Sequence, residues 1–430
     1  MIQLYNSNYE QIIKKIQDRL SFNNRKESTV VREILEDIRQ NGDIALIKYI
    51  NRFESPKLPL TKVKLSQDEI DNAHDRTDDE MLNIIKTAIK NIQNYHNQFK
   101  LKNWDKKFFQ NKSSLGMKIT PIERVGVYVP GGTATYPSTV LMNVIPAQIA
   151  GVKEIALVTP SNKQGKINDL LLATAKELGI IEIYRMGGAQ GIAALSYGTE
   201  SVKPVYMIAG PGNIYVTLAK KEIFGVVGID KLAGPSDICV VADKTSNPKY
   251  IAADLLAQAE HDTLASAILI TDSTDLANKV QKAIKELYAE LPRKEIMKQS
   301  LSNNSAIFLV KNNDLKTIYN LVNMIAPEHL EIFHKQHQDL LKKIKNAGAI
   351  FVGEYSAEVL GDYILGPNHV LPTGGTAKFS SPLSVIDFQK TSSIIFMNKN
   401  DSQKLSVDAA KLARHEDLPA HALAAKLRVD

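Results

Sequence analysis

The sequence predicts an α/β protein built from two incomplete Rossmann-like parallel-sheet lobes, with helical segments at both ends of the chain. Short β-type runs alternate with helical patterns of roughly 10 to 15 residues, which is typical of βαβ units. The alternation begins a second time after Gly234-Pro235-Ser236. A chain of 430 residues is long enough for two domains with separate cores. Two such lobes leave a crevice between them, where ligands often bind.

The first hundred residues predict helices. Ser28 to Gly42 carries apolar residues on one helical face and ends in a glycine where a C-terminal cap belongs. Ser66 to Glu69 and Thr77 to Glu80 both fit a capping box, which marks a helix start. We therefore expect an N-terminal helical arm over residues 1–22 and a helical segment over residues 23–117 that packs on the second lobe.

The β-type runs place the two lobes. The first lobe spans residues 118–235, and its strands are predicted at Val125–Val129, Ile155–Val158, Ile181–Tyr184 and Val205–Ile208. The second lobe, residues 236–386, has predicted strands at Ile238–Val241, Ala267–Ile270, Ile307–Val310 and Ile350–Val352. Residues 387–430 return to a helical pattern and form the expected C-terminal segment.

Composition limits the possible partners. Hydrophobic residues make up 44% and charged residues 23%, as in ordinary globular proteins, and the formal net charge of +6 is small. Nucleic acid is therefore not expected as a partner. The most basic stretch, Lys100 to Lys112, carries Trp104, Phe108 and Phe109, and we interpret it as a connector or interface segment because bulky apolar residues favour burial.

The single cysteine, Cys239, cannot form a disulfide within the chain, which favours a cytoplasmic location. It lies in an apolar β-type run, so we expect a buried, unreactive thiol. The N-terminus lacks a signal-peptide pattern, and no apolar run reaches about 18 residues. We therefore expect a cytoplasmic protein with no membrane partner.

Three glycine turns follow strands of the first lobe, at Pro130–Gly132, Gly187–Gly191 and Gly210–Asn213. Each precedes a helix, so backbone N–H groups and helix dipoles could meet a phosphate there. Three turns in succession favour a nucleotide site. The dinucleotide fingerprint G-x-G-x-x-G is absent, and no acidic residue about 20 positions on fits its scheme. NAD would therefore bind in a non-standard way, with side chains such as Tyr128, Gln190 and Asn213.

Candidate metal ligands are scattered over the second half. Gln258 and His261 are three residues apart, on one helix face. Asp362 and His369 lie in a loop rich in glycine and proline, and a mixed amide, imidazole and carboxylate set suits catalytic zinc. Near the end, His415-Glu416 resembles the start of a zinc-protease helix. The next histidine, His421, is six residues on with Pro419 between, so that interpretation fails.

Glu328 and His329, in Ala326-Pro327-Glu328-His329-Leu330, place a carboxylate beside an imidazole at a bend fixed by proline. Adjacent side chains point in different directions, so the two could serve separate proton transfers in one pocket. The alternative is a solvated glutamate beside a half-buried histidine, and these residues alone do not exclude it.

Taken together, these motifs resemble the histidinol dehydrogenase family, NAD- and zinc-dependent enzymes of the last two steps of histidine biosynthesis. The Glu328-His329 pair and Gly366-Pro367-Asn368-His369-Val370-Leu371-Pro372-Thr373 carry the resemblance most specifically. The matching segments are Val125–Met142, Met186–Leu195, Ala209–Val216, Ala233–Asp237, Leu255–Asp262, Ala326–Leu330, Gly361–Asp387 and Leu418–His421. Asp237 and Asp417 depart from the usual pattern at positions that carry no ligand.

The resemblance implies which residues bind the cofactor, the metal and the substrate. It implies NAD contacts at Tyr128, Gln190 and Asn213 and catalytic roles for Glu328 and His329. One zinc ion per subunit would be held by Gln258, His261, Asp362 and His421. L-histidinol would be bound by Ser236, Gln258, His261, His329, Asp362, His369, Glu416 and His421. Family members are homodimers, so Glu416 and His421 are expected to complete a site across the subunit interface.

The reaction implied is a four-electron oxidation of L-histidinol to L-histidine through L-histidinaldehyde, with two NAD+. His329, with an ordinary pKa near 6.5, would act in both oxidations, and Glu328 would activate the water that hydrates the aldehyde. An inert Cys239 favours a hydrate over a thiohemiacetal. Two alternatives remain from the sequence alone: a zinc hydrolase using water activated by Glu328, and a two-lobed binding protein without chemistry.

Overall fold

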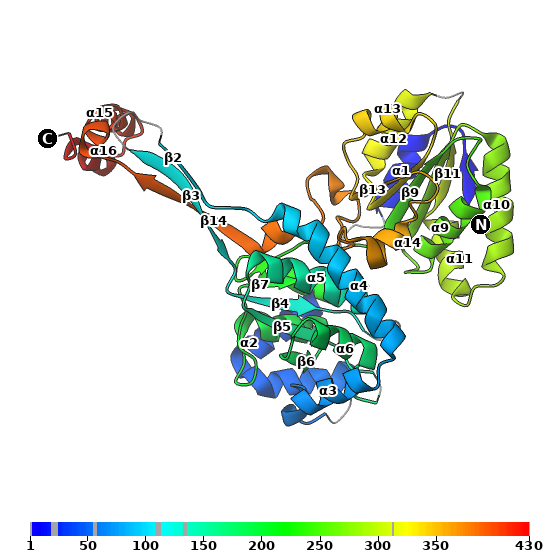
Figure 1. The fold of residues 1–430 in the computed structure, drawn as a ribbon, viewed down its shortest axis with the longest axis horizontal. Coiled ribbons are helices and arrows are strands. Elements are labelled where there is room, and N and C mark those ends of the chain that lie inside the picture. The colour runs from blue at the N-terminus through cyan, green and yellow to red at the C-terminus, as the bar shows by residue number, and fades with distance from the viewer. Residues whose placement is uncertain are drawn as a thin grey trace.

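The computed structural model describes residues 2–18, 25–54, 58–107, 113–131, 136–162, 164–311 and 314–429. Figure 1 shows two α/β lobes side by side and a long β-ribbon that leads away from the first lobe to the C-terminal helices. Phe108, Phe109 and Gly132, which the sequence analysis singled out, lie outside the described residues. Among the described residues, no helix is long and apolar enough to cross a membrane.

The first lobe contains a parallel sheet with strand order β6-β5-β4-β7-β8. Four of its strands confirm the predicted ones. The strands are β4 (Arg124–Tyr128), β5 (Glu154–Thr159), β6 (Ile183–Arg185), β7 (Met207–Ala209) and β8 (Gly228–Ile229). Its helices are α5 (Pro137–Ala150), α6 (Asp169–Glu177), α7 (Gly188–Tyr197) and α8 (Ile214–Ile223).

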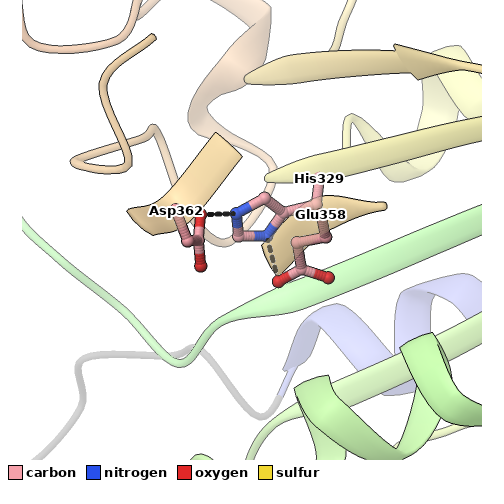
Figure 2. Close-up of side chains that lie close together, drawn as sticks. All are labelled: His329, Glu358 and Asp362. Carbon is pink, nitrogen blue, oxygen red and sulfur yellow. Dashed lines mark ion pairs between the residues drawn. The ribbon is translucent and has the colours of Figure 1, made fainter. Parts of the chain in front are cut away.

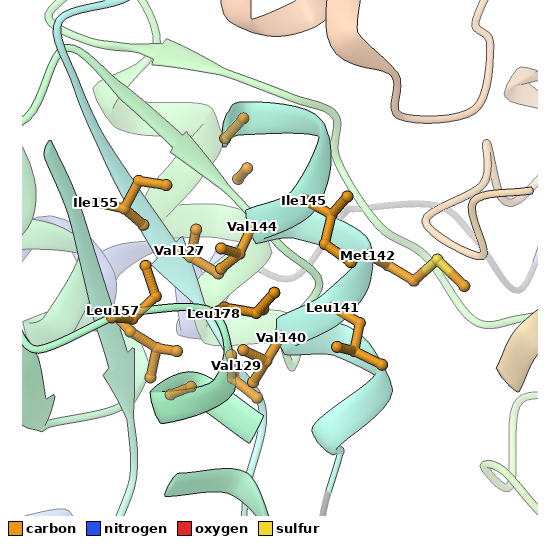
Figure 3. Close-up of a cluster of buried hydrophobic side chains, with 14 of the residues drawn as sticks. Val127, Val129, Val140, Leu141, Met142, Val144, Ile145, Ile155, Leu157 and Leu178 are labelled. Carbon is orange, nitrogen blue, oxygen red and sulfur yellow. The ribbon is translucent and has the colours of Figure 1, made fainter. Parts of the chain in front are cut away.

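Alternating side chains of these strands pack into two hydrophobic cores, one on each face of the sheet. Val127 of β4 and Val129, directly after the strand, pack with α5 and α6, as Figure 3 shows. Tyr128 of β4 points to the other face and packs with α7 and α8. A central strand buried on both faces reads as a continuous apolar run, which is why the sequence predicted it.

The helices of residues 23–117 pack mainly on the first lobe, and not on the second lobe as predicted. The segment is also not helical to its end, because it contains strands from Trp104 on. Helix α2 (Arg25–Phe53) shares a core with α7 and α8, while α3 (Gln67–Asp75) and α4 (Asp79–His96) cover the α5–α6 side. An amphipathic sequence pattern predicts that a helix has a buried face, but it does not predict which sheet that face packs against.

Details of these helices test the capping predictions. Helix α2 breaks at Gly42, at φ 51° and ψ −130°, so the predicted end at this glycine is confirmed. The capping box of Ser66 and Glu69 is confirmed as well. The one at Thr77 is wrong: Asp78 precedes α4, and the Thr77 hydroxyl donates to the Ala73 carbonyl oxygen at 2.9 Å.

The second lobe has a parallel sheet with strand order β1-β11-β10-β9-β12-β13. Four strands were predicted; the edge strand β1 and the inner strand β12 were not, so the arm over residues 1–22 is not purely helical. The strands are β1 (Gln3–Tyr5), β9 (Asp237–Ala242), β10 (Ser266–Thr271), β11 (Ala306–Leu309), β12 (His329–Phe333) and β13 (Ala349–Val352).

Helices cover both faces of this second sheet. One core contains α9 (Pro248–Ala259), α10 (Thr274–Tyr288) and α11 (Lys294–Asn303). The other contains α1 (Tyr9–Asp18), α12 (Leu315–Ile325) and α13 (His337–Lys343). After β13, the short α14 (Glu358–Leu360) runs into a π-helical turn, Gly361–Leu365, which α4 of the first lobe contacts.

The C-terminal segment begins with a strand, which corrects the purely helical prediction for residues 387–430. β14 (Gln389–Phe396) pairs antiparallel with β3 (Ser114–Pro121), which pairs in turn with β2 (Trp104–Lys107). The ribbon ends at α15 (Lys399–His415) and α16 (Pro419–Lys426), far from the second lobe (Figure 1). Several of its large apolar side chains are exposed: Ile394, Ile395, Phe396, Leu405, Leu412, Leu423 and Leu427.

Candidate active site

A cavity of about 690 Å³ lies between the lobes and gathers most of the predicted site residues. The first lobe contributes Pro130, Tyr136 and the Gly210–Asn213 turn. The second contributes residues around the starts of β9 and β12 and the 361–373 loop. The predicted residues that line it are Asn213, Ser236, Gln258, His261, Glu328, His329, Asp362 and His369. Tyr128, Gln190, Glu416 and His421 do not line it.

The bend before β12 sets the directions of Glu328 and His329. Helix α12 ends at Ile325, and Ala326 takes a left-handed conformation, φ 49° and ψ 62°, ahead of Pro327. Ala326 is an uncommon choice there because its Cβ disfavours this conformation. β12 then begins at His329, so the two side chains point to different neighbours, as predicted.

Glu328 faces the start of β9. Its backbone N–H donates to Asp237 Oδ1 at 2.9 Å, and its Oε2 accepts from the Asp237 N–H at 3.2 Å. Burial raises the pKa of Glu328 to about 8; the Asp237 and Asp362 charges raise it further, and His329 opposes them. A carboxyl group with a pKa near working pH is suited to act as a general base. Asp237, a departure from the family pattern, is therefore a direct neighbour of Glu328.

His329 lies between two carboxylates and is buried, with only 4% of its surface exposed. Its Nδ1 is 3.3 Å from Glu358 Oε1, and its Nε2 is 3.4 Å from Asp362 Oδ1, as Figure 2 shows. Burial alone would lower the pKa of His329, but the charges of Glu358, Glu328 and Asp362 outweigh it and raise the pKa well above its ordinary value. The surrounding carboxylates therefore favour the protonated form of the ring.

Glu358 is a site residue that the sequence analysis missed. It begins α14, is 3% exposed, and burial raises its pKa to about 8. Its backbone N–H donates to Glu331 Oε1 at 3.0 Å. Residues two apart in a strand share a face, so the spacing of His329 and Glu331 in the sequence indicates a polar patch on one face of β12. Nothing local pointed to Glu358, which lies 29 positions beyond His329 in the sequence.

Three of the four predicted zinc ligands converge on the cavity. Gln258 lies in the last turn of α9 and is fully buried, and neither side-chain amide atom has a hydrogen-bond partner among the described residues. Burial lowers the pKa of His261, which keeps its imidazole neutral as metal binding requires. The Asp362 carboxylate interacts electrostatically with both His261 and His369. An unsatisfied amide, a neutral imidazole and a carboxylate fit zinc.

A second group of candidate ligand atoms overlaps with the first. One atom each from His329, Glu358 and Asp362 lies within 4.8 Å of the others. His369 stands beside them, with its Nδ1 at 3.0 Å from the Asp362 backbone oxygen, and burial lowers its pKa. Because both ring nitrogens of His329 face carboxylate oxygens, we take this group as the surroundings of a catalytic histidine and not as the metal site.

The glycine turns differ from the predicted phosphate cradles. Gly187 N–H and Gln190 Nε2 both donate to Glu54 Oε1, at 2.8 and 2.7 Å, and Gly188 N–H donates to the Tyr128 hydroxyl at 3.0 Å. Tyr128 and Gln190 are buried behind this turn. The first amides of helix α7 therefore already have protein partners, so the predicted cradle at Gly187–Gly191 needs correction.

The Gly210–Asn213 turn is closed in the same way. Gly210 N–H donates to Asp230 Oδ2 at 2.8 Å, and Gly210 O accepts from Lys220 Nζ at 2.9 Å. Lys220 and Asp230 also form a buried ion pair. Asn213 caps α8 by accepting from the Tyr215 and Val216 N–H groups, and it lines the cavity as predicted.

Glu416 and His421 lie apart from the cavity. Glu416 follows α15 and His421 lies in α16, and both are exposed at the end of the ribbon. Within one chain, these residues do not join Gln258, His261 and Asp362 (Figure 1).

Several known proteins resemble this chain over most of its length. The family model described as histidinol dehydrogenase matches residues 17–429. Histidinol dehydrogenase from Bacillus licheniformis is 50% identical over 400 residues, 93% of this chain and 92% of that protein. The Bacillus subtilis protein is 48% identical over 400 residues, again 93% and 92%. The crystal structure of histidinol dehydrogenase from Elizabethkingia anophelis has a TM-score of 0.93 and 36% identity, and covers 100% of this chain and 98% of that one.

Proposed function

The chain belongs to the histidinol dehydrogenase family of NAD-dependent oxidoreductases, and we propose that it oxidises L-histidinol to L-histidine in two steps with zinc and two NAD+. The observation that carries the proposal is the gathering of Gln258, His261 and Asp362 beside the Glu328-His329 pair in one cavity. Membership of an oxidoreductase family disfavours the hydrolase and the binding protein.

The substrate would lie between the lobes, where Ser236 and His369 also line the cavity. Zinc held by Gln258, His261 and Asp362 would orient the substrate's imidazole and amine and draw the charge of Asp362 away from His329. The dinucleotide would take the first-lobe side, next to Asn213. Tyr128 and Gln190 are buried behind the Gly187–Gly191 turn, so they would act by supporting the first-lobe side of the dinucleotide site.

His329 would serve both oxidations as the base. It takes the hydroxyl proton of histidinol as one hydride leaves for NAD+, and later a proton of the aldehyde hydrate as the second hydride leaves. It must be neutral to do so, and weakening of its ion pair with Asp362 lowers its pKa toward that state. Glu358 would hold the ring in place through Nδ1, leaving Nε2 directed at the side of Asp362.

Glu328 would serve the water step between the oxidations. In its ionised form it removes a proton from the water that adds to the aldehyde carbon. It lies next to His329 in the chain but faces Asp237, so it can act on a different atom of the bound substrate. Cys239 is fully buried and burial raises its pKa far above the ordinary value, which supports a hydrate and not a thiohemiacetal.

We further propose a homodimer in which the C-terminal helices of one subunit complete the site of the other. His421 is too distant to join the ligands of its own chain. The exposed apolar residues on the ribbon, and exposed Tyr355, Tyr363 and Phe379 near the cavity loop, are surfaces that subunit contact would cover. Mixing two inactive variants tests this arrangement.

The variants are His329→Gln and His421→Ala, co-expressed with different tags and purified as the mixed dimer. If sites are shared, one of the two sites in the mixed dimer has both residues intact, so about half of the wild-type activity returns. Sites contained within single chains would give no recovery, and the shared-site proposal would be wrong.

The oxidation itself is tested by the NADH yield from limiting L-histidinol. We expect two NADH per substrate, loss of the reaction after chelation, and its return with zinc. A yield of one NADH with accumulated aldehyde would contradict the second oxidation. Full activity of the chelated, metal-free protein would contradict the zinc requirement.

A further inference from the structure

The dinucleotide brings a doubly charged pyrophosphate into a cavity beside which two glycine N–H groups of the first lobe already have carboxylate partners. Gly187 N–H is bonded to the Glu54 carboxylate, and Gly210 N–H is bonded to the Asp230 carboxylate. A carboxylate at a helix start occupies the place that a phosphate would take. These two N–H groups are therefore already occupied, and the positive charge that balances the pyrophosphate has to come from a side chain.

Few positively charged side chains line the described part of the cavity and could bind the pyrophosphate. Among the described lining residues there are two lysines, Lys220 and Lys231, and no arginine. Lys220 is neutralised by its buried ion pair with Asp230. Lys231 has no carboxylate within ion-pair distance among the described residues, although it follows Asp230 directly.

Lys231 is held in place by the loop that follows His369. Its Nζ donates to the Val370 carbonyl oxygen at 3.0 Å and to the Ser381 carbonyl oxygen at 2.8 Å. An ammonium group has three N–H donors, so one remains for a ligand in the cavity. Burial lowers the pKa of Lys231, and the more distant charges of Asp230, Asp387 and Glu328 only partly oppose this. A partly buried ammonium with no carboxylate in direct contact gains from an arriving anion.

We propose that Lys231 binds the pyrophosphate of the dinucleotide and thereby places it at the junction of the two lobes. This inference rests on the proposed function only in taking the dinucleotide to occupy this cavity. It assigns the phosphate charge to one side chain that lines the cavity between the lobes, in place of backbone N–H groups of a glycine turn.

Binding of two ligands to the zinc-loaded full-length protein tests the assignment by calorimetry. ADP-ribose carries the pyrophosphate, and adenosine lacks it. Lys231→Gln keeps amide N–H donors for the two carbonyls but removes the charge. We expect it to weaken ADP-ribose binding roughly tenfold, as for loss of a charge-assisted hydrogen bond, and to leave adenosine binding unchanged.

Matched variants separate this role from others. Lys221→Gln removes the same charge from the exposed side of α8 and should change neither affinity, while Lys231→Arg should keep the preference for ADP-ribose. L-histidinol binding to Lys231→Gln should equal that of wild type, which shows that the loop is intact. Equal losses for ADP-ribose and adenosine, or no loss for ADP-ribose, would overturn the assignment. Neither result depends on whether wild type forms NADH from histidinol, so the proposed function is judged separately.

Discussion

The two lobes share a sheet architecture but present opposite edges of their sheets to the cavity. In the first lobe, β4 and β7 run out into Pro130 and the Gly210–Asn213 turn, at the carboxyl edge. In the second lobe, Ser236 and Glu328 precede β9 and β12, at the amino edge. The rule that α/β sheets bind ligands at their carboxyl edge therefore holds for one lobe only.

The two edges also differ in how their polar groups are satisfied. The first lobe closes the Gly187 and Gly210 amides with its own carboxylates. Unsatisfied buried atoms occur in both lobes, Glu54 Oε2 among them, but those that line the cavity belong to the second lobe. They are both amide atoms of Gln258 and both ring nitrogens of His329, which lack hydrogen-bond partners among the described residues. Buried polar groups are rarely left unsatisfied without a reason. The glycine turns are therefore largely architecture, and the unsatisfied groups mark the place for ligand and chemistry.

Replacing the histidine at the second-lobe edge should have the largest effect. His329→Gln removes the base from both oxidations, and we expect kcat for each to fall about 10³-fold, within the range for general-base catalysis. Stopped-flow absorbance at the NADH band measures both steps. His337→Gln, on α13 and outside the cavity lining, is the control and should be near wild type. A loss below about threefold for His329→Gln would place the base elsewhere.

Gly210 tests whether the first-lobe turn is architectural. A Cβ there would lie 2.1 Å from the Tyr128 backbone oxygen, and φ is +108°. We expect Gly210→Ala to lower the free energy of unfolding by roughly 3 kcal/mol, a large value tied to backbone strain and overlap. Gly225→Ala is matched, with φ +104° and open space around it, and should cost about 1 kcal/mol. Equal losses in urea unfolding would show that the close approach to Tyr128 is unimportant.

The pKa of Glu328 predicts a pH dependence confined to the water step. A pKa of about 8 leaves the carboxyl group mostly protonated, and inactive as a base, below that pH. Aldehyde oxidation should therefore rise about tenfold per pH unit up to about pH 8 and level off above it. Single-turnover rates with histidinaldehyde, measured as a function of pH, test this rise. A rate that is flat from pH 6 to 9 would show that Glu328 does not act as the base.

The smallest effect is expected at Cys239. Cys239→Ala removes a fully buried sulfur from β9 and should cost about 1 kcal/mol of stability through lost packing. Both oxidation rates should stay within twofold of wild type. Loss of the aldehyde step alone would instead point to a thiohemiacetal and remove the need for Glu328-activated water.

The sequence predicted the buried strands because a parallel strand between two helical layers is a local apolar run. It missed β12 because His329 and Glu331 interrupt that run, and it missed the ribbon because β3 and β14 pair across a long stretch of sequence. The lobe on which α2 to α4 pack, and the carboxylates of Glu54 and Glu358, depend on contacts between distant segments. Family resemblance supplied the ligand set, and the fold then brought Gln258, His261 and Asp362 to one cavity.

The division of labour at the second-lobe edge is tested most directly by Glu328→Gln in single-turnover assays of the two half-reactions. Loss of the water-activating carboxylate should slow histidinaldehyde oxidation about 10²-fold and change histidinol oxidation to the aldehyde by less than threefold. Equal slowing of both half-reactions would contradict separate roles for Glu328 and His329.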